Sequence, residues 1–277
     1  MKPPLAAVVG CPVRHSLSPA IFRAFSAAMG RRLHYRALEI RPCGLAAALE
    51  RASGDPRWVG WNVTLPHKVD VLRYLDDADD TARAAGAANV VRFSGRRCVG
   101  YNTDIEGFLA PLARLGFKLR GKQVVVLGAG GAARAVCAAL SRAGIRGAVI
   151  LNRTLPKAQA LATRFQWRAG GTDPESVAQA SAGADLVINA TPVGSVRGST
   201  LLPPGLRLRR GALAYDLLYR PSQTPFMERA RQGGAETLGG LGMLVVQAAA
   251  TWRLWFSEAV PADVLSRVEA DLSRRGT

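Results

Sequence analysis

A glycine-rich turn that directly follows a continuous aliphatic run constrains the fold of this chain more than any other feature. The run covers residues 123–127 and leads into Gly128-Ala129-Gly130-Gly131-Ala132-Ala133, and a helical pattern over residues 132–143 ends at Gly144. A strand, a G-x-G-x-x-G/A turn and a helix in this order are typical of a dinucleotide-binding unit. The first glycine would permit the tight turn, and the second would let a pyrophosphate approach the backbone and the first N–H groups of the helix. A glycine turn alone is a weak signal, so the flanking strand and helix carry the prediction.

The segments after this turn continue the alternation of strands and helices. Further apolar runs stand at residues 148–151, 186–189 and 213–217, each preceded by a helix-like or loop segment. This βαβαβ order predicts a doubly wound parallel sheet, in a unit that begins near Ile105.

The end of the second predicted strand indicates which dinucleotide binds. NAD-binding units usually place Asp or Glu there to accept from the ribose 2′-hydroxyl. This chain has Asn152-Arg153-Thr154 instead, with Lys157 shortly after, and no carboxylate. Arginine binds a phosphate bidentately, and a hydroxyl and a lysine add contacts, so we expect NADP rather than NAD. The competing interpretation is a surface arginine in a chain where 32 of 37 basic residues are arginine.

The first hundred residues alternate short β-type runs with helical patterns. The pattern predicts strands over residues 6–10, 33–40, 59–64 and 89–93, and helices over 19–29, 45–52 and 66–74. Pro19 and Pro66 suit the first turn of a helix. Such alternation predicts an α/β domain with a largely parallel sheet. Residues 240–277 predict two helices joined around Pro261, and the pattern alone leaves open which domain they join.

Composition and spacing exclude several other classes of function. The 277 residues suffice for two modest domains, and 37 basic against 20 acidic residues give a net charge of +17. This charge suits a phosphate-bearing partner, but the basic residues are scattered, which predicts a solvated surface and no nucleic-acid site. The four cysteines and three histidines lack the spacing of a metal site or a disulfide framework. Apolar runs are too short for a signal peptide or a membrane span, so we expect a cytoplasmic protein.

Eight short segments, spread over nearly the whole chain, together resemble the shikimate dehydrogenase family. Their number and order make a specific pattern. They are residues 10–19 (GCPVRHSLSP), 62–68 (NVTLPHK), 86–89 (GAAN), 100–104 (GYNTD), 152–154 (NRT), 189–194 (NATPVG), 215–219 (YDLLY) and 240–247 (GLGMLVVQ).

The resemblance implies a fold and an activity. The fold is an N-terminal α/β substrate domain (residues 1–104), a Rossmann-type NADP-binding domain (105–239) and C-terminal helices (240–277) that pack back on the first domain. The activity is the reversible NADPH-dependent reduction of 3-dehydroshikimate to shikimate, on the route to chorismate and aromatic amino acids, by a monomer or homodimer. Alternatives are a quinate/shikimate or aminoshikimate dehydrogenase, or a non-catalytic NADP-binding module.

The resemblance also implies a catalytic pair, Lys68 and Asp104. Reducing a ketone requires a proton for the developing alkoxide, and a lysine ammonium can stabilise that charge and supply the proton, directly or through a bound water. Arginine could scarcely release a proton, so a lysine in this arginine-rich chain is informative. Without the resemblance, Lys68 would be a solvated residue in the first turn of a helix and Asp104 an N-cap.

Further site residues follow from the same resemblance. Those expected to bind substrate are Ser16, Ser18, Thr64, Asn89, Asp104, Tyr219 and Gln247; those expected to bind the cofactor are Gly128, Ala129, Gly130, Gly131, Ala132, Asn152, Arg153, Thr154, Lys157, Leu217 and Gly240. The two serines could instead cap a helix, and the other polar residues could serve turns or the core.

Two features set this chain apart from the usual pattern of the family, and a third has a local interpretation. Ser195 stands where methionine is common, beside the expected nicotinamide position. Trp61 replaces a smaller residue, which is expected to reshape the pocket wall. The acidic run from Asp76 to Asp80 predicts a capped, solvated start of a helix.

Overall fold

The computed structural model describes residues 2–195 and 198–275, and the chain divides into two compact units. Unit 1 consists of Met1–Phe108 and Val245–Ala270, and unit 2 of Leu109–Leu244 and Asp271–Thr277. The three boundaries fall inside helices, namely α4 (Asp104–Arg114), α9 (Leu241–Phe256) and α10 (Ala262–Arg274), so each of these helices contributes residues to both units.

Unit 1 contains a mixed sheet in the order β2-β1-β3-β5-β6-β4. Strand β1 pairs parallel with β2 and β3, whereas β3–β5 and β5–β6 are antiparallel. Every residue of β1 is buried, as expected for a strand covered on both faces. The strands are β1 (Leu5–Gly10), β2 (His34–Glu39), β3 (Trp58–Val63), β4 (Asp77–Ala78), β5 (Val90–Ser94) and β6 (Arg97–Tyr101), and the helices are α1 (Ser18–Ala28), α2 (Leu45–Ser53), α3 (Asp80–Ala85) and α10 (Ala262–Arg274), with 3-10 turns η1 (Pro42–Gly44) and η2 (Asp70–Tyr74).

The predicted helix over residues 66–74 is wrong in its first half. The chain makes a turn after β3, in which the N–H of His67 donates to the carbonyl of Thr64, and only Asp70–Tyr74 is helical, as a 3-10 turn. The carbonyl of Lys68 accepts from the N–H of Ala88 at 2.7 Å, so it is not available to a residue one helical turn later. This tertiary bond holds residue 68 in a turn beside the beginning of β5.

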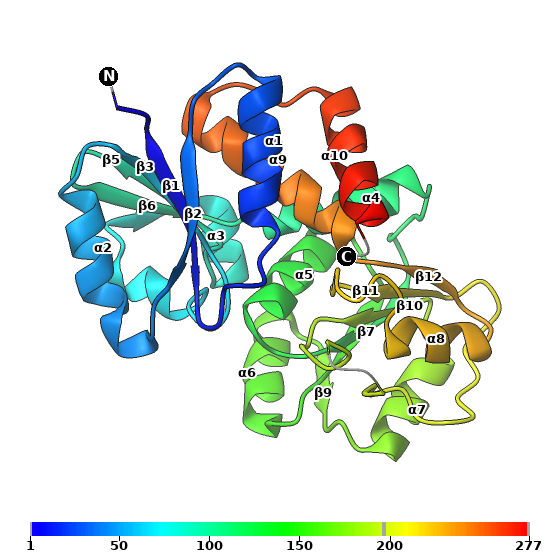
Figure 1. The fold of residues 1–277 in the computed structure, drawn as a ribbon. Coiled ribbons are helices and arrows are strands. Elements are labelled where there is room, and N and C mark those ends of the chain that lie inside the picture. The colour runs from blue at the N-terminus through cyan, green and yellow to red at the C-terminus, as the bar shows by residue number, and fades with distance from the viewer. Residues whose placement is uncertain (1, 196–197, 276–277) are drawn as a thin grey trace. The chain divides into compact units, whose positions relative to one another are not determined.

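The C-terminal helices pack on the N-terminal segment within unit 1, as the family resemblance implies. Helix α9 lies beside α1 (Figure 1), and the ring of Trp252 is 6.4 Å from Phe22 and 6.2 Å from Phe25, centroid to centroid. Phe22 in turn stacks on Tyr35 of β2, with centroids 4.3 Å apart. Large buried aromatic rings contribute much of the stability of such a contact, so this cluster fixes α9 against the sheet.

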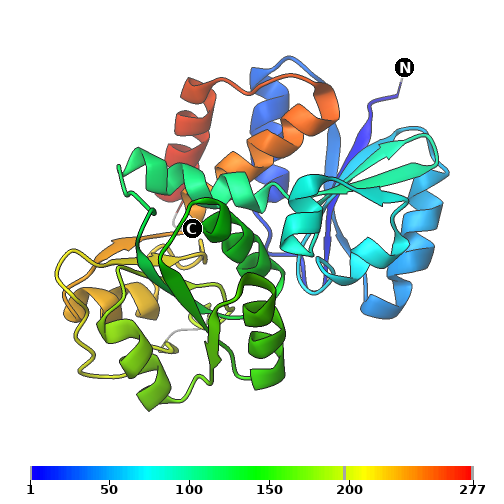
Figure 2. The same cartoon turned by 180° about the vertical axis from the view of Figure 1, so that it is seen from behind.

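Unit 2 is a doubly wound α/β domain, as predicted. Its sheet has the order β12-β11-β10-β7-β8-β9 and all its pairings are parallel. Helices α5 and α6 cover one face and α7 and α8 the other (Figure 1, Figure 2). The strands are β7 (Gln123–Leu127), β8 (Gly147–Leu151), β9 (Arg168–Gly170), β10 (Leu186–Asn189), β11 (Leu213–Asp216) and β12 (Glu236–Leu238), and the helices are α5 (Gly131–Arg142), α6 (Leu155–Phe165), α7 (Pro174–Ala182) and α8 (Pro225–Gln232).

The order of connections in unit 2 reverses between β7 and β10. From β7 the chain moves outward to β8 and β9, then returns to β10 and continues in the opposite direction to β12. Ligands of open α/β sheets bind at the carboxyl ends of the strands beside such a reversal. The glycine-rich turn follows β7, so it lies at that position.

Candidate active site

Lys68 and Asp104 form a buried ion pair in unit 1. The Nζ atom of Lys68 lies 2.5 Å from Oδ2 of Asp104, and the two side chains are 14% and 5% exposed. The turn after β3 supplies the lysine, and the first residue of α4 supplies the carboxylate. Because both side chains are buried and paired with each other, neither has the solvated or capping role that the sequence alone would favour.

Asn89 holds the other oxygen of this carboxylate. Its Nδ2 atom donates to Oδ1 of Asp104 and to Oγ1 of Thr103, each at 2.9 Å, and its Oδ1 accepts from the N–H of Thr103 at 2.7 Å. Asn89 is 2% exposed. The carboxylate is thus fixed from both sides, and it holds the ammonium where that group can stabilise an oxyanion and give up a proton.

Helix α9 contributes two further polar side chains to this cluster. Oε1 of Gln247 lies 3.3 Å from Nδ2 of Asn89 and 3.5 Å from Oγ1 of Thr103. One turn later, Oγ1 of Thr251 lies 3.3 Å from Oγ1 of Thr103. A lone glutamine in an apolar helical run is therefore explained by buried polar partners.

A second branch of the network reaches β2. Thr251 Oγ1 accepts from Nδ2 of Asn62 at 3.1 Å, and Oδ1 of Asn62 accepts from the hydroxyl of Tyr35 at 2.8 Å. Burial raises the pKa of the Tyr35 phenol well above its ordinary value, and a hydrogen bond with Ser18 acts in the opposite direction. The network of hydrogen bonds therefore runs from Lys68 to Tyr35 of β2.

The two serines stand at the beginning of α1. Leu17 occupies the N-cap position, and Oγ of Ser16 accepts from the N–H of Ser18, the first residue of the helix, at 3.2 Å. Oγ of Ser16 also donates to Oγ of Ser18 at 3.1 Å, and Ser18 is 5% exposed. Two adjacent hydroxyls at the N-terminus of a helix form a site suited to an anion. Thr64 lies on the neighbouring turn, where a Cβ at Gly10 would come within 2.5 Å of its Cγ2.

Several members of this network were not predicted as site residues. Asn62 and Thr103 lie inside segments that resemble the family, but no role was assigned to them. Thr251 and Tyr35 lie outside these segments. The available signal was the spacing of Thr251, which follows Gln247 by four residues and so shares its helical face.

The tryptophan at position 61 does not line this site. Its ring is 1% exposed and packs edge-on against Phe93 at 5.4 Å and against Trp58 at 6.1 Å. Successive side chains of a strand point to opposite faces of the sheet, so Asn62 faces the network and Trp61 faces the α2 side of the core. The expectation that it reshapes the pocket wall is wrong.

The acidic run begins a capped helix, as predicted. Asp79 is the N-cap of α3 and accepts from the N–H of Ala82 at 2.9 Å, while the side chain of Asp80 is 93% exposed. Asp76 accepts from the N–H of Cys98 at 2.7 Å, which joins this segment to β6.

The glycine-rich turn of unit 2 has the open geometry that a pyrophosphate needs. Gly128 has φ of 114°, and a Cβ there would come 2.9 Å from the carbonyl oxygen of Ala190. Around Gly130, by contrast, no described residue other than its two chain neighbours has an atom within 4 Å of the place of a Cβ. Helix α5 begins at Gly131 without a side-chain cap and without an acidic residue in its first turn, and Ala129 and Ala132 complete the turn. Backbone N–H groups at this terminus can therefore receive phosphate oxygens.

The basic side chains after β8 are exposed and unengaged. Neither the guanidinium of Arg153 nor the ammonium of Lys157 forms a hydrogen bond or ion pair with another residue that the structure describes, and both residues are exposed. Asn152 shapes the turn by donating from Nδ2 to the carbonyl of Thr154 at 2.9 Å. Thr154 is the N-cap of α6, yet its hydroxyl caps no N–H group. Two cations and a hydroxyl therefore surround the beginning of a second helix, an arrangement that fits a phosphate.

The turns after β10 and β11 are held together by a buried carboxylate. Asp216 accepts from Thr224 at 2.6 Å, and from Asn189 and the N–H of Leu218 at 3.0 Å each. Burial raises the pKa of Asp216 to about 6, although these hydrogen bonds oppose that effect. This network was not predicted. The feature of the sequence that indicates it is a polar residue at the end of each of two aliphatic strands, Asn189 in β10 and Asp216 in β11.

Leu217, Gly240 and Tyr219 lie close to this carboxylate in the chain fold. A Cβ at Gly240 would come 2.2 Å from the carbonyl oxygen of Leu217, so only glycine fits there. Tyr219 is half-buried in the same loop of unit 2. Oγ of Ser195 donates to the carbonyl of Pro192 at 2.7 Å, which gives this hydroxyl a role within its own turn.

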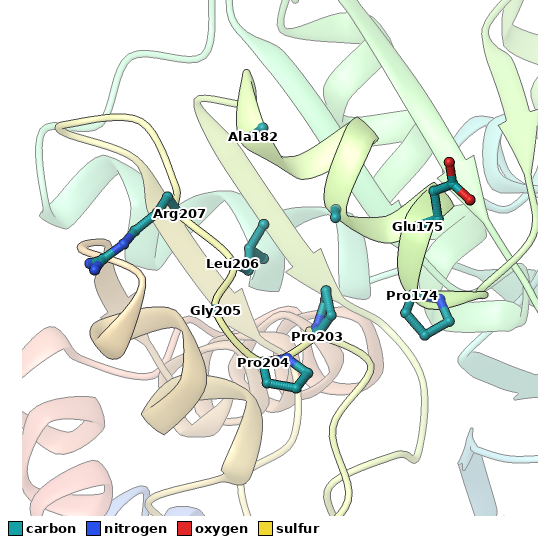
Figure 3. A pocket seen from close by; sticks show the side chains of 9 residues that line it. Pro174, Glu175, Ala182, Pro203, Pro204, Gly205, Leu206 and Arg207 are labelled. Atoms are coloured by element: carbon teal, nitrogen blue, oxygen red, sulfur yellow. The ribbon is translucent and has the colours of Figure 1, made fainter.

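A surface hollow of about 540 Å³ lies elsewhere in unit 2, between α7 and residues 203–207. Prolines, alanines and backbone form most of its wall, and its two charged residues, Glu175 and Arg207, lie at opposite ends (Figure 3). It includes none of the candidate site residues.

In the described ranges, no three His, Cys, Asp or Glu side chains gather as metal ligands, and no helix is long and apolar enough to cross a membrane.

Comparison with known proteins points in one direction. The family described as "Shikimate dehydrogenase substrate binding domain" matches residues 8–91, and that described as "Shikimate / quinate 5-dehydrogenase" matches residues 111–196. The chain is 42% identical over 270 residues to a shikimate dehydrogenase (NADP(+)) of Symbiobacterium thermophilum, an alignment that covers 93% of this chain and 90% of the relative.

Solved structures agree with the sequence matches. Shikimate 5-dehydrogenase of Thermus thermophilus, in complex with NADP(H) and shikimate, has a TM-score of 0.87 at 35% identity, covering 97% of this chain and 99% of the other. A ligand-free 5-ketofructose reductase of a Gluconobacter species has a TM-score of 0.82 at 31% identity, covering 98% and 99%. The fold thus occurs in reductases of different ketones.

Proposed function

Because the chain belongs to the shikimate dehydrogenase family, we propose that it catalyses the reversible NADPH-dependent reduction of 3-dehydroshikimate to shikimate, a step toward chorismate and the aromatic amino acids. The observation that carries this proposal is the Lys68–Asp104 pair, buried in unit 1 and connected by hydrogen bonds to Asn89 and Gln247. Reduction of a carbonyl requires a group that stabilises the developing negative charge and donates a proton, and a lysine ammonium oriented by a carboxylate and by amide side chains can do both.

In the proposed reaction, Lys68 acts on the oxygen of the ketone. Its ammonium stabilises the negative charge that develops there and delivers the proton, directly or through a water that it holds. Asp104 orients the ammonium through Oδ2 and accepts a hydrogen bond from a substrate hydroxyl. In the reverse direction the same pair removes the proton from the hydroxyl of shikimate.

The remaining polar residues bind the substrate at both of its ends. The hydroxyls of Ser16 and Ser18 bind the carboxylate, and Thr64, Asn89, Tyr219 and Gln247 bind the ring hydroxyls. The serine pair favours a substrate with a carboxylate over a neutral keto sugar such as 5-ketofructose. Quinate has an additional hydroxyl on the carbon that bears the carboxylate, so this part of the site discriminates against it.

NADPH, when bound, supplies the hydride from its nicotinamide. The turn from Gly128 to Ala132 holds the pyrophosphate with its backbone N–H groups. Arg153 binds the 2′-phosphate, assisted by Asn152, Thr154 and Lys157, and the absence of an acid beside this position makes NADP the preferred dinucleotide. The backbone of Leu217 and Gly240 would contact the nicotinamide.

These roles divide the chain into a substrate domain and a cofactor domain. The substrate domain comprises residues 1–104 and 240–277, and the cofactor domain comprises residues 105–239. We place the reaction in the cytoplasm and expect a monomer or a homodimer, which light scattering on the purified protein distinguishes.

An absorbance assay of the purified protein tests the proposed function. Shikimate and quinate are each supplied with NADP+ and with NAD+, and the appearance of the reduced nicotinamide is followed. The proposal predicts turnover of shikimate with NADP+ and a lower kcat/KM for quinate and for NAD+. Binding of NADP+ with no turnover of either acid would show instead a non-catalytic NADP-binding module.

A further inference from the structure

The hydrogen bonds behind the Lys68–Asp104 pair converge on one hydroxyl, that of Thr251. This residue is fully buried in α9 and belongs to none of the segments that resemble the family. We infer that Thr251 is a positioning residue, which fixes the direction of the hydrogen bonds that orient Asp104. The inference rests on the proposed function, because its consequence is a change in the rate of the proposed reaction.

The hydroxyl of Thr251 determines the direction of its neighbours' hydrogen bonds, because its single proton is already in use. A threonine hydroxyl has one proton and two acceptor positions. The proton of Thr251 is used by the carbonyl of Gln247, at 2.9 Å in the preceding turn of the helix. Its oxygen therefore can only accept from the two remaining neighbours, Nδ2 of Asn62 at 3.1 Å and the hydroxyl of Thr103 at 3.3 Å.

The hydrogen bonds donated by Asn89 are directed in consequence. Once the hydroxyl proton of Thr103 points to Thr251, Oγ1 of Thr103 is free to accept from Nδ2 of Asn89, at 2.9 Å. The second proton on that nitrogen then points to Oδ1 of Asp104, also at 2.9 Å. Asp104 thereby receives one directed donor from Asn89 and one from Lys68, and its plane is fixed.

On the other side, Thr251 determines the orientation of the Asn62 amide. With Nδ2 of Asn62 donating to Thr251, its Oδ1 must face Tyr35, whose hydroxyl donates to it at 2.8 Å. One hydroxyl thus orders the hydrogen bonds both toward Asp104 and toward Tyr35 of β2.

Loss of this hydroxyl would release the proton of Thr103. Its other acceptors are Oδ1 of Asn89 at 3.3 Å and Oε1 of Gln247 at 3.5 Å. The first of these oxygens already accepts from the N–H of Thr103, and the second lies 3.3 Å from Nδ2 of Asn89, whose two protons point to Thr103 and Asp104. Turning the Thr103 hydroxyl toward either oxygen would weaken its bond with Nδ2 of Asn89 and move the Asn89 amide away from Asp104. Displacements of about 1 Å near reacting groups can cost about a hundredfold in rate.

The test compares Thr251→Val, which keeps the shape of the side chain and removes the hydroxyl, with Thr251→Ser, which keeps the hydroxyl. We expect kcat for shikimate oxidation to fall about tenfold in Thr251→Val, because Asp104 is mispositioned, and to remain within about twofold of wild type in Thr251→Ser. The KM for NADP+ should not change in either variant. If Thr251→Val does not fold, Thr103→Val removes the same link from its other end and should cause a similar fall.

A control variant separates positioning from general destabilisation. Val264→Ala opens space in α10 within unit 1, outside the network, and should lower the melting temperature without lowering kcat at a temperature where the protein is folded. Equal kcat in wild type and Thr251→Val, or equal losses in the Val and Ser variants, would overturn the inference while leaving the proposed function in place. A wild-type protein that does not turn over shikimate would overturn both.

Discussion

The ammonium of Lys68 lies 2.5 Å from Oδ2 of Asp104, although the two residues come from different elements, the turn after β3 and the first turn of α4. The pair is 36 residues apart in sequence and nearly excluded from solvent. Burying two opposite charges is favourable only when the remaining donors and acceptors are satisfied. Asn89 satisfies the second oxygen of Asp104, so the pair persists as a preorganised acid.

Replacing Lys68 with alanine should lower kcat for shikimate oxidation by about 10²–10³, because one preorganised donor to the developing charge is lost. KM for shikimate should change much less, since the ammonium interacts mainly with charge that exists in the transition state. Lys68→Arg is the matched control: it keeps the positive charge, scarcely releases a proton, and should not restore kcat. Steady-state kinetics that show an unchanged kcat and a higher KM would make Lys68 a binding residue.

Removing Ser18 should weaken binding of the substrate carboxylate. A hydrogen bond to a charged group contributes about 1.5–3 kcal/mol, so Ser18→Ala should raise the dissociation constant of shikimate by roughly one to two decades. Isothermal titration in the presence of NADP+ measures this constant. Ser26→Ala, in the same helix with its hydroxyl bonded to the carbonyl of Arg31, should leave the constant unchanged. Equal effects of the two variants would exclude a carboxylate contact at Ser18.

The exposed guanidinium of Arg153 should determine the preference for NADP. Arg153→Ala should cost about 1.5–3 kcal/mol of NADPH affinity and little NADH affinity, because only NADPH has the 2′-phosphate. Lys157 compensates in part, which moves the expected loss toward the lower value. Arg120→Ala provides a matched control, since Arg120 is exposed before β7, at the other end of this strand from the glycine turn. Equal losses for both dinucleotides would show that Arg153 does not read the phosphate.

The carboxyl group of Asp216 should make the stability of the protein depend on pH. Its pKa is raised to about 6 by burial in the folded protein. A raised pKa means that the stabilising contribution is complete below the unfolded value of about 4 and is lost as pH rises through about 6. The difference between these folded and unfolded pKa values corresponds to about 3 kcal/mol at most.

Asp216→Asn removes this titration while keeping a neutral hydrogen-bonding side chain. The free energy of unfolding of wild type, minus that of Asp216→Asn, should therefore fall by up to about 3 kcal/mol between about pH 4 and pH 7. Urea unfolding at several pH values measures this difference. Parallel pH curves for the two proteins would show that Asp216 titrates at an ordinary value.

The sequence predicted the elements whose pattern is local. The aliphatic run before Gly128 and the glycines themselves specify a strand and a turn without help from distant residues, and β7 and α5 lie where this pattern predicts them. The helix over residues 66–74 was predicted wrongly because the carbonyl of Lys68 is bonded to Ala88, a partner that no local pattern reveals.

The inner part of the site depends on contacts between distant segments. Asn62 and Thr251 are 189 residues apart in sequence, and their hydrogen bond exists only because the aromatic contacts of α9 bring this helix onto the sheet of unit 1. The direction of the Trp61 side chain likewise follows from which face of β3 the network occupies. Resemblance to a family identified the residues proposed to touch substrate, whereas the residues behind them required the fold.

The most direct test of the central claim compares the reduction of two ketones, supplied separately to the wild-type protein. 3-Dehydroshikimate and 5-ketofructose are each supplied with NADPH, kcat/KM is measured from the oxidation of the cofactor, and the product of the first reaction is identified by NMR. The Lys68–Asp104 pair together with the serine pair predicts formation of shikimate and a higher kcat/KM for 3-dehydroshikimate. A higher kcat/KM for the neutral keto sugar, or no shikimate formed, would contradict the account.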